Sequence, residues 1–174
     1  MQPTHMSVAI WLTLAGCCAA ALCDVRSRRI PNWLTGALAL AAVVVNAFGG
    51  WKSLAVALAI MAGMTLLGTL VYARGGIGGG DVKLAIGGSG LLGYPLFIPF
   101  LLYTAIAGGA LAVLYLVLRP GSRPSLSRTV MLAAGGLQGI SAKRETLPYA
   151  LAFAIGAILV ALSQSVAPFL RINL

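Results

Sequence analysis

The chain contains very few acidic residues. Only Asp24, Asp81 and Glu145 are acidic among 174 residues, against twelve Lys and Arg, and charged residues make up 9% of the sequence. Soluble domains carry about 25% charged residues. A chain with so little charge could not cover a surface that faces water, so the composition excludes a soluble globular protein.

The side chains that commonly hold metals or form disulfides are also scarce. His5 is the single histidine, and the three cysteines, Cys17, Cys18 and Cys23, lie in or beside the first apolar run without a CxxC pair. This spacing argues against a disulfide framework and against a zinc site. We therefore expect neither a metal nor a cofactor.

Apolar residues, by contrast, make up 60% of the chain. This excludes intrinsic disorder and predicts an all-α polytopic membrane protein, with residues 1–174 in one domain. Small residues within the runs, as in 105–112, predict close helix packing. About six apolar runs could form membrane-crossing helices, at about 7–23, 33–49, 53–73, 82–94, 95–118 and 147–169.

The first run could instead be a signal peptide. A signal peptide begins with a positively charged stretch, yet no Lys or Arg precedes Arg26. We therefore expect an uncleaved helix.

The basic residues predict the orientation in the membrane. If six helices alternate, Lys52 and Arg171 fall on one side and the other ten basic residues on the opposite side. The positive-inside rule then places the N-terminus outside and the loop 119–146 in the cytoplasm.

A strongly basic chain can also indicate nucleic-acid binding. Here the basic residues lie between apolar runs, which favours contacts with anionic membrane lipid and no nucleic-acid partner.

Asp24 and Asp81 are expected at the same membrane face, because the first run ends at Asp24 and the fourth begins at Asp81. Each alone could have an ordinary role, Asp24 as an interfacial acid and Asp81 as an acid in a first helical turn. Together they indicate function, since ionisable residues near the bilayer are expensive.

Two close carboxylates share a proton. The ionised one can activate water while the protonated one polarises a peptide carbonyl, as in aspartic proteases.

Five of the six residues in 75–80 are glycines. Such a backbone can adopt positive φ angles and approach a substrate closely. The alternative is a cytoplasmic turn without any contact to a substrate.

Gly78-Gly79-Gly80-Asp81 matches the Gly-x-Gly-Asp motif of membrane aspartyl proteases. Asp24 precedes a basic loop that contains Pro31-Asn32, and Leu147-Pro148-Tyr149-Ala150 follows late in the chain. With these features the chain resembles the bacterial type IV prepilin peptidases, and most of all their short tight-adherence (Flp-pilus) kind.

The resemblance implies that Asp24 and Asp81 are the catalytic pair and that Gly78, Gly79 and Gly80 shape the loop that positions Asp81. The implied substrate is a prepilin, whose basic leader is cut at the cytoplasmic face of the bacterial inner membrane, just before its hydrophobic helix. Larger members also methylate the new N-terminus and carry a cytoplasmic segment with cysteine pairs. This chain lacks such a segment, so we expect peptidase activity alone, without N-methyltransferase activity.

Lys83 lies two residues after Asp81. Positions i and i+2 on a helix do not face each other, so a direct ion pair is not assured. Lys83 could reach the membrane interface, or it could bind an acidic group of the substrate near the cleavage site.

A non-enzymatic interpretation also remains open. The acids could handle ions or protons in a small transporter or in a pilus-assembly subunit. Transporters favour acids at the membrane midplane, whereas the protease hypothesis requires them near the cytoplasmic surface. A related archaeal preflagellin peptidase or signal-peptide peptidase would share the chemistry and differ in its substrate.

Overall fold

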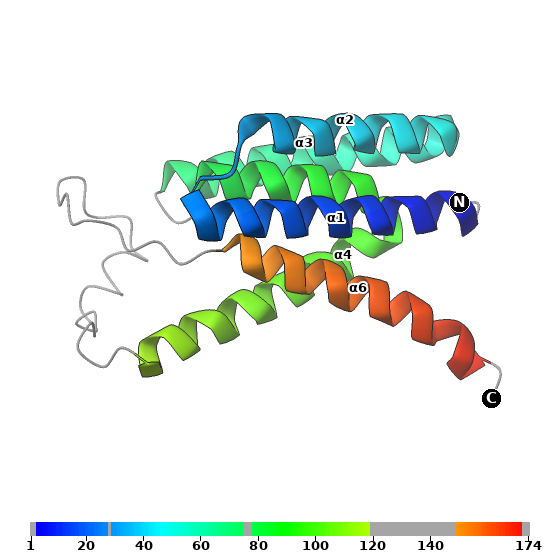
Figure 1. Ribbon diagram of the computed structural model, residues 1–174. Coiled ribbons are helices and arrows are strands. Elements are labelled where there is room, and N and C mark those ends of the chain that lie inside the picture. The colour runs from blue at the N-terminus through cyan, green and yellow to red at the C-terminus, as the bar shows by residue number, and fades with distance from the viewer. Residues whose placement is uncertain (1–2, 28, 75–77, 119–148, 172–174) are drawn as a thin grey trace.

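The computed structural model describes residues 3–27, 29–74, 78–118 and 149–171, and over these ranges the regular secondary structure is entirely α-helical (Figure 1). The prediction of an all-α protein is confirmed for these ranges, while the predicted loop 119–146 lies outside them. The helices are α1 (Pro3–Ser27), α2 (Asn32–Phe48), α3 (Trp51–Ala73), α4 (Gly79–Leu118) and α6 (Ala150–Arg171).

Among the described residues, three helical stretches are long and apolar enough to cross a membrane, namely His5–Ser27, Trp51–Ala73 and Gly79–Leu114. Two further apolar helices, Asn32–Phe48 and Ala150–Ser165, are shorter. Helix α3 has a single buried residue, Ala57, although its exposed side chains are mostly apolar. A surface of this kind suits lipid rather than water, so the chain is a membrane protein. The six crossings and the outside N-terminus stay predictions.

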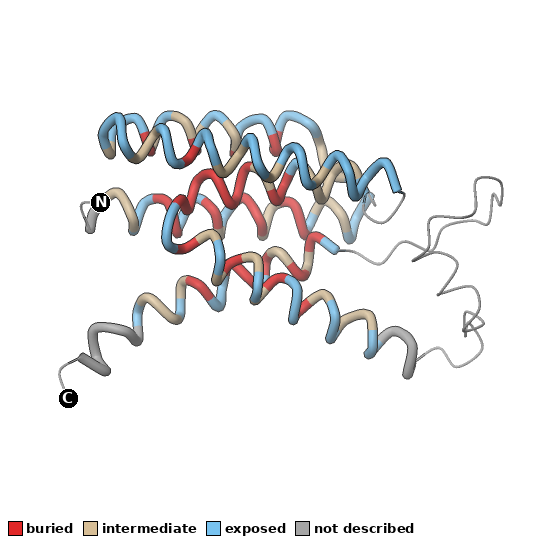
Figure 2. Tube along the Cα trace, turned by 180° about the vertical axis from the view of Figure 1, so that it is seen from behind, coloured by how far each residue is buried: buried red, intermediate tan, exposed pale blue. Residues whose placement is uncertain are grey.

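Helix α4 is bent at Gly93, which has a φ of 59° and a ψ of −168°, and at Tyr94. Only glycine adopts such backbone angles readily, and the following Pro95 has no N–H to continue the helix. The expected runs 82–94 and 95–118 are therefore the two arms of one helix. Figures 1 and 2 show that the second arm turns back toward the end of the bundle where α4 begins.

The first arm of α4 is the centre of the packed core. Residues 84–85 and 87–93 are buried (Figure 2), and α1, α2, α3 and α6 all contact α4. A Cβ at Gly87 would lie 3.0 Å from the Cβ of Leu38, so the small residue lets α2 and α4 approach closely. This packing fixes the helix that carries Asp81 in its first turn.

A buried polar network adds a second constraint on the first arm. Asn46 Nδ2 on α2 donates hydrogen bonds to the carbonyl oxygens of Ala42, at 2.8 Å, and of Gly90 on α4, at 3.1 Å. Ser53 Oγ on α3 donates to Asn46 Oδ1 at 2.8 Å. One side chain thus links three helices.

Candidate active site

Asp24 is half-buried and lies just before the end of α1. Ser27 Oγ closes this helix end, within hydrogen-bond distance of the carbonyl oxygens of Cys23, at 2.8 Å, and of Arg29, at 3.2 Å. The chain then turns into α2, where Pro31 O accepts a hydrogen bond from Leu34 N at 3.1 Å. Asp24 therefore precedes a tight connection between two helices.

Asp81 is the third residue of α4 and is also half-buried. The carbonyl oxygen of Gly78 accepts hydrogen bonds from Asp81 N, at 3.1 Å, and from Val82 N, at 3.2 Å, and so closes the first turn. A Cβ at Gly78 would lie 2.9 Å from Asp81 Oδ2. Glycine at this position therefore leaves the space that the carboxylate occupies.

Gly79 and Gly80 pack against neighbouring elements. A Cβ at Gly80 would lie 3.3 Å from the Cβ of Ile30, in the connection after α1, and a Cβ at Gly79 would lie 3.4 Å from the Tyr72 ring on α3. These contacts hold the start of α4 against the segment that follows Asp24. The residues 75–77 of the glycine-rich stretch lie outside the described part of the chain.

The two aspartates lie at helix ends on the same side of the bundle, although 57 positions separate them in the sequence. The end of α1 and the beginning of α4 lie at the same end of the bundle (Figure 1). Asp24 is close enough for its negative charge to act on the Asp81 carboxyl. Like charges on neighbouring carboxylates disfavour each other, so the two groups are electrostatically coupled at this end of the bundle.

Asp81 also borders a cavity of about 320 Å³ between the second arm of α4 and the beginning of α6. We call it the Asp81 cavity. Its other walls come from α4 and from the start of α6, and they are formed by Thr104, Ala105, Gly108, Gly109, Ala112, Tyr149, Ala152 and Phe153. The cavity thus places the second arm of α4 and the start of α6 beside Asp81.

Several of these wall residues were missed by the sequence analysis. Tyr149 belongs to the Leu-Pro-Tyr-Ala stretch, which could have indicated a place at the site. Thr104 and Gly109 lie in an apolar run whose small residues predicted only packing, because nothing in their spacing indicates chemistry.

Lys83 is exposed and is directed to α2 instead of the Asp81 cavity. Its Nζ donates a hydrogen bond to Asn32 Oδ1 at 2.8 Å. The two side chains border a separate hollow of about 280 Å³ together with Thr35, Gly36, Ala39 and Ile86. Lys83 thus connects the beginning of α4 to the first residue of α2.

Within the described ranges, no three His, Cys, Asp or Glu side chains gather where they could hold a metal ion. The described lining of the Asp81 cavity includes one carboxyl group, that of Asp81, and one phenol, that of Tyr149.

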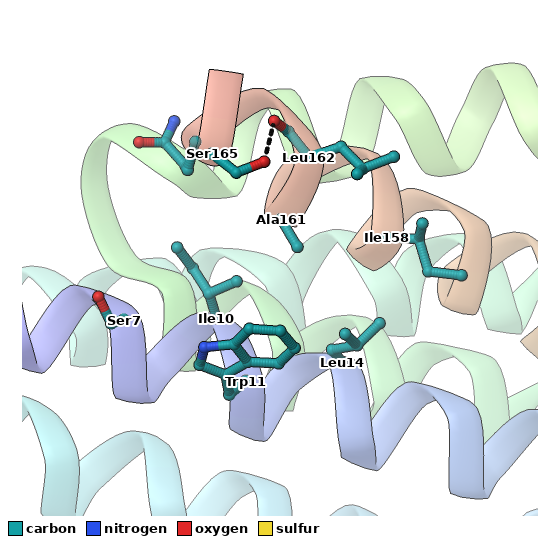
Figure 3. A pocket seen from close by; sticks show the side chains of 9 residues that line it. Ser7, Ile10, Trp11, Leu14, Ile158, Ala161, Leu162 and Ser165 are labelled. Carbon is teal, nitrogen blue, oxygen red and sulfur yellow. Dashed lines mark hydrogen bonds between the residues drawn. The ribbon is translucent and has the colours of Figure 1, made fainter. Parts of the chain in front are cut away.

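A larger cavity, of about 350 Å³, lies between α1 and α6 and is formed mainly by apolar side chains (Figure 3). Trp11 and Leu14 line it on α1, and Ile158 and Leu162 on α6. Its lining contains no ionisable side chain, and it lies toward the opposite ends of these helices from Asp24. It therefore offers no proton-transfer chemistry.

The fold and the site define a class, an all-helical membrane protein with a pair of interacting carboxylates at one end of its bundle. Residues 11–113, which include both aspartates, match the family model described as the type IV leader peptidase family. The chain belongs to this family, as its motifs predicted, and is a peptidase of the prepilin leader peptidase type. Comparisons with curated proteins and with solved structures gave no match.

Proposed function

We propose that the protein is an aspartic endopeptidase in which Asp24 and Asp81 activate water to cleave the basic leader from Flp-type prepilins. The observation that carries this proposal is the placement of the two acids: Asp24 near the end of α1 lies close enough for its charge to act on half-buried Asp81, which begins α4 beside a cavity. The family supplies the peptidase activity, and the paired carboxylates supply a mechanism for it.

The chemistry follows from one shared proton. The ionised carboxylate takes a proton from water as the oxygen attacks the scissile carbonyl, and the protonated carboxyl donates to the carbonyl oxygen. When the tetrahedral intermediate collapses, a proton passes to the leaving amine. The first turn of α4 favours negative charge on Asp81, but either carboxylate can begin as the base.

The positions of the acids favour a site at the membrane surface. Asp24 lies three residues before the end of α1, and Asp81 lies two residues after the beginning of α4. Arg26 lies in the last turn of α1, and Arg29 and Arg74 follow α1 and α3 at this end. Such residues favour the cytoplasmic side of the inner membrane. Carboxylates at helix ends suit a cut just before a hydrophobic helix better than ion transport through the midplane.

The test is co-expression with a Flp-type prepilin, with cleavage followed as a size shift. Asp24→Asn and Asp81→Asn nearly preserve shape but cannot exchange a proton, so each should lower the cleavage rate by about 10²–10⁴-fold. Glu145→Gln removes the third acid of the chain and should leave cleavage unchanged. Wild-type rates in either Asn variant would show that the pair is not the catalytic centre.

A further inference from the structure

We propose that Lys83 is a positioning residue of this peptidase, whose hydrogen bond to Asn32 fixes the rotation of α4 about its axis. That rotation decides where the Asp81 carboxylate lies relative to Asp24. The inference rests on the proposed function, because it concerns how the same two carboxylates are held in place. It gives Lys83 a role that requires no contact with the substrate.

Two contacts hold the beginning of α4 against the segment that follows Asp24. Lys83 Nζ donates a hydrogen bond to Asn32 Oδ1 at 2.8 Å. At Gly80 the backbone is so close that a Cβ there would lie 3.3 Å from the Cβ of Ile30. Positions 80 and 83 are three residues apart, so they lie on one face of the helix. Two contacts along one face restrict the rotation of α4, which a single contact would allow.

The rotation matters because Asp81 lies on a different side of the helix from these contacts. Successive residues of an α-helix are about 100° apart around its axis, and side chains end about 5 Å from that axis. A rotation of α4 by about 12° would therefore move the Asp81 carboxylate by about 1 Å. Misplacing a catalytic group by this distance can lower the rate by about 100-fold.

The acceptor on α2 is held in place by its own surroundings. Asn32 is the first residue of α2 and follows Pro31, whose carbonyl oxygen accepts a hydrogen bond from Leu34 N at 3.1 Å. Asn32 O accepts a further hydrogen bond from Thr35 Oγ1 at 3.1 Å. Thr35 is only 4% exposed, so it anchors this turn in the core. A fixed acceptor lets the hydrogen bond transmit the position of α2 to α4.

Lys83 is exposed, so the strength of its hydrogen bond depends on the medium around it. It is the fifth residue of a helix that is long and apolar enough to cross a membrane. Where lipid headgroups replace bulk water, fewer water molecules compete for the ammonium group, and a charge-assisted hydrogen bond is stronger. The hydrogen bond should therefore hold the helix more firmly than it would on the surface of a soluble protein.

A double-mutant cycle in the prepilin cleavage assay tests the proposal. Lys83→Met and Asn32→Ala each remove one partner, and each should lower kcat about tenfold while KM stays unchanged. The double variant should be no slower than either single variant, because both changes break the same hydrogen bond. Lys83→Arg keeps a charged donor and should restore most of kcat. Lys52→Met, at the opposite end of the bundle, is the matched control and should cleave like the wild type.

A disulfide reports on the same geometry without cleavage. In a chain whose native cysteines are replaced by alanine, Ile30→Cys and Gly80→Cys bring two Cβ atoms within about 0.5 Å of the Cβ–Cβ distance of about 3.8 Å in a disulfide. Mild oxidation should bridge the two thiols and protect them from a maleimide reagent. Adding Lys83→Met should slow the bridging about tenfold, because α4 is then free to rotate, and adding Lys52→Met should not.

Three results would decide against the proposal or against its basis. A raised KM in Lys83→Met, or losses of kcat that multiply in the double variant, would mean that Lys83 contacts the substrate, and would overturn the positioning role. Equal bridging rates with and without Lys83→Met would overturn it as well. A wild-type chain that leaves the prepilin uncut would count against the proposed function, and the bridging rate would then decide the role of Lys83 alone.

Discussion

At the start of α4, the missing side chain of Gly78 determines where the Asp81 carboxylate can lie. A Cβ there would approach Asp81 Oδ2 to 2.9 Å, closer than carbon and oxygen atoms normally pack. We expect Gly78→Ala to displace the carboxylate from Asp24 and to lower kcat by about 10- to 100-fold, because small misplacements of catalytic groups are costly. Cleavage assays at matched expression would measure this effect.

The control for Gly78→Ala is Gly63→Ala, which adds the same methyl group in open space on α3. Both variants should have thermal midpoints close to that of the wild type, since neither methyl group enters the core. Unchanged kcat in Gly78→Ala would mean that the glycine serves the turn and not the carboxylate.

The contacts of Lys83 could not be predicted from the motif. Its position two residues after Asp81 was compatible with contact to the membrane interface and with binding of the substrate. The structure instead pairs its Nζ with Asn32 Oδ1. Asn32 begins α2, eight positions after Asp24, so the hydrogen bond links the helix that carries Asp81 to the helix that follows the Asp24 segment. Lys83 thus acts on the site through the positions of α2 and α4.

At the scale of single helices, the bend in α4 decides whether the Asp81 cavity exists. Gly93 has backbone angles that other residues adopt at a cost of about 1–3 kcal/mol. Gly93→Ala should therefore lower the thermal midpoint of the detergent-solubilised protein and reduce cleavage, because the second arm can no longer take its place beside α6. Gly63→Ala, in a regular helix, should leave the midpoint unchanged or slightly raised. Equal midpoints for the two variants would contradict this role of the bend.

The sequence predicts the helices well and the cavity poorly, for a physical reason. Runs of apolar residues give the positions of the helices, and Pro95 marks the break within α4. The motif around Asp81 and the alternation of the helices together place both acids at one end. The walls near Thr104 and Gly109 arise from contacts between α4 and α6, segments far apart in the chain. Small residues in an apolar run look alike whether they face a neighbouring helix or a substrate.

For the molecule as a whole, the central first arm of α4 connects the packing of the core to the chemistry of the site. Helices α1, α2, α3 and α6 all contact α4, and the network around Asn46 holds the first arm at Gly90. The second arm has many exposed apolar side chains, such as Leu102 and Ile106. A rigid first arm would keep Asp81 in place near Asp24, while the second arm and the start of α6 form the other walls of the Asp81 cavity.

The arrangement in the membrane gives the last prediction. Figures 1 and 2 show the bend of α4 at the same end of the bundle as the turn between α2 and α3, opposite the end that holds the aspartates. If both arms cross the bilayer, Tyr94 and Trp51 face the outside and Arg74 the cytoplasm. Tyr94 and Trp51 are 65% and 76% exposed, so cysteines there would be accessible.

With Cys17, Cys18 and Cys23 replaced by alanine, a membrane-impermeant thiol reagent should label Tyr94→Cys and Trp51→Cys in cells whose outer membrane alone is opened. Arg74→Cys should react only after the inner membrane is disrupted. The first arm of α4, which runs from Gly79 to the bend at Gly93, is shorter than the roughly 20 residues that usually span a bilayer. Tyr94→Cys, at the end of this short arm, is therefore the decisive position. If it reacts like Arg74→Cys, the first arm does not cross the membrane, and the aspartates then lie on the same side as the bend.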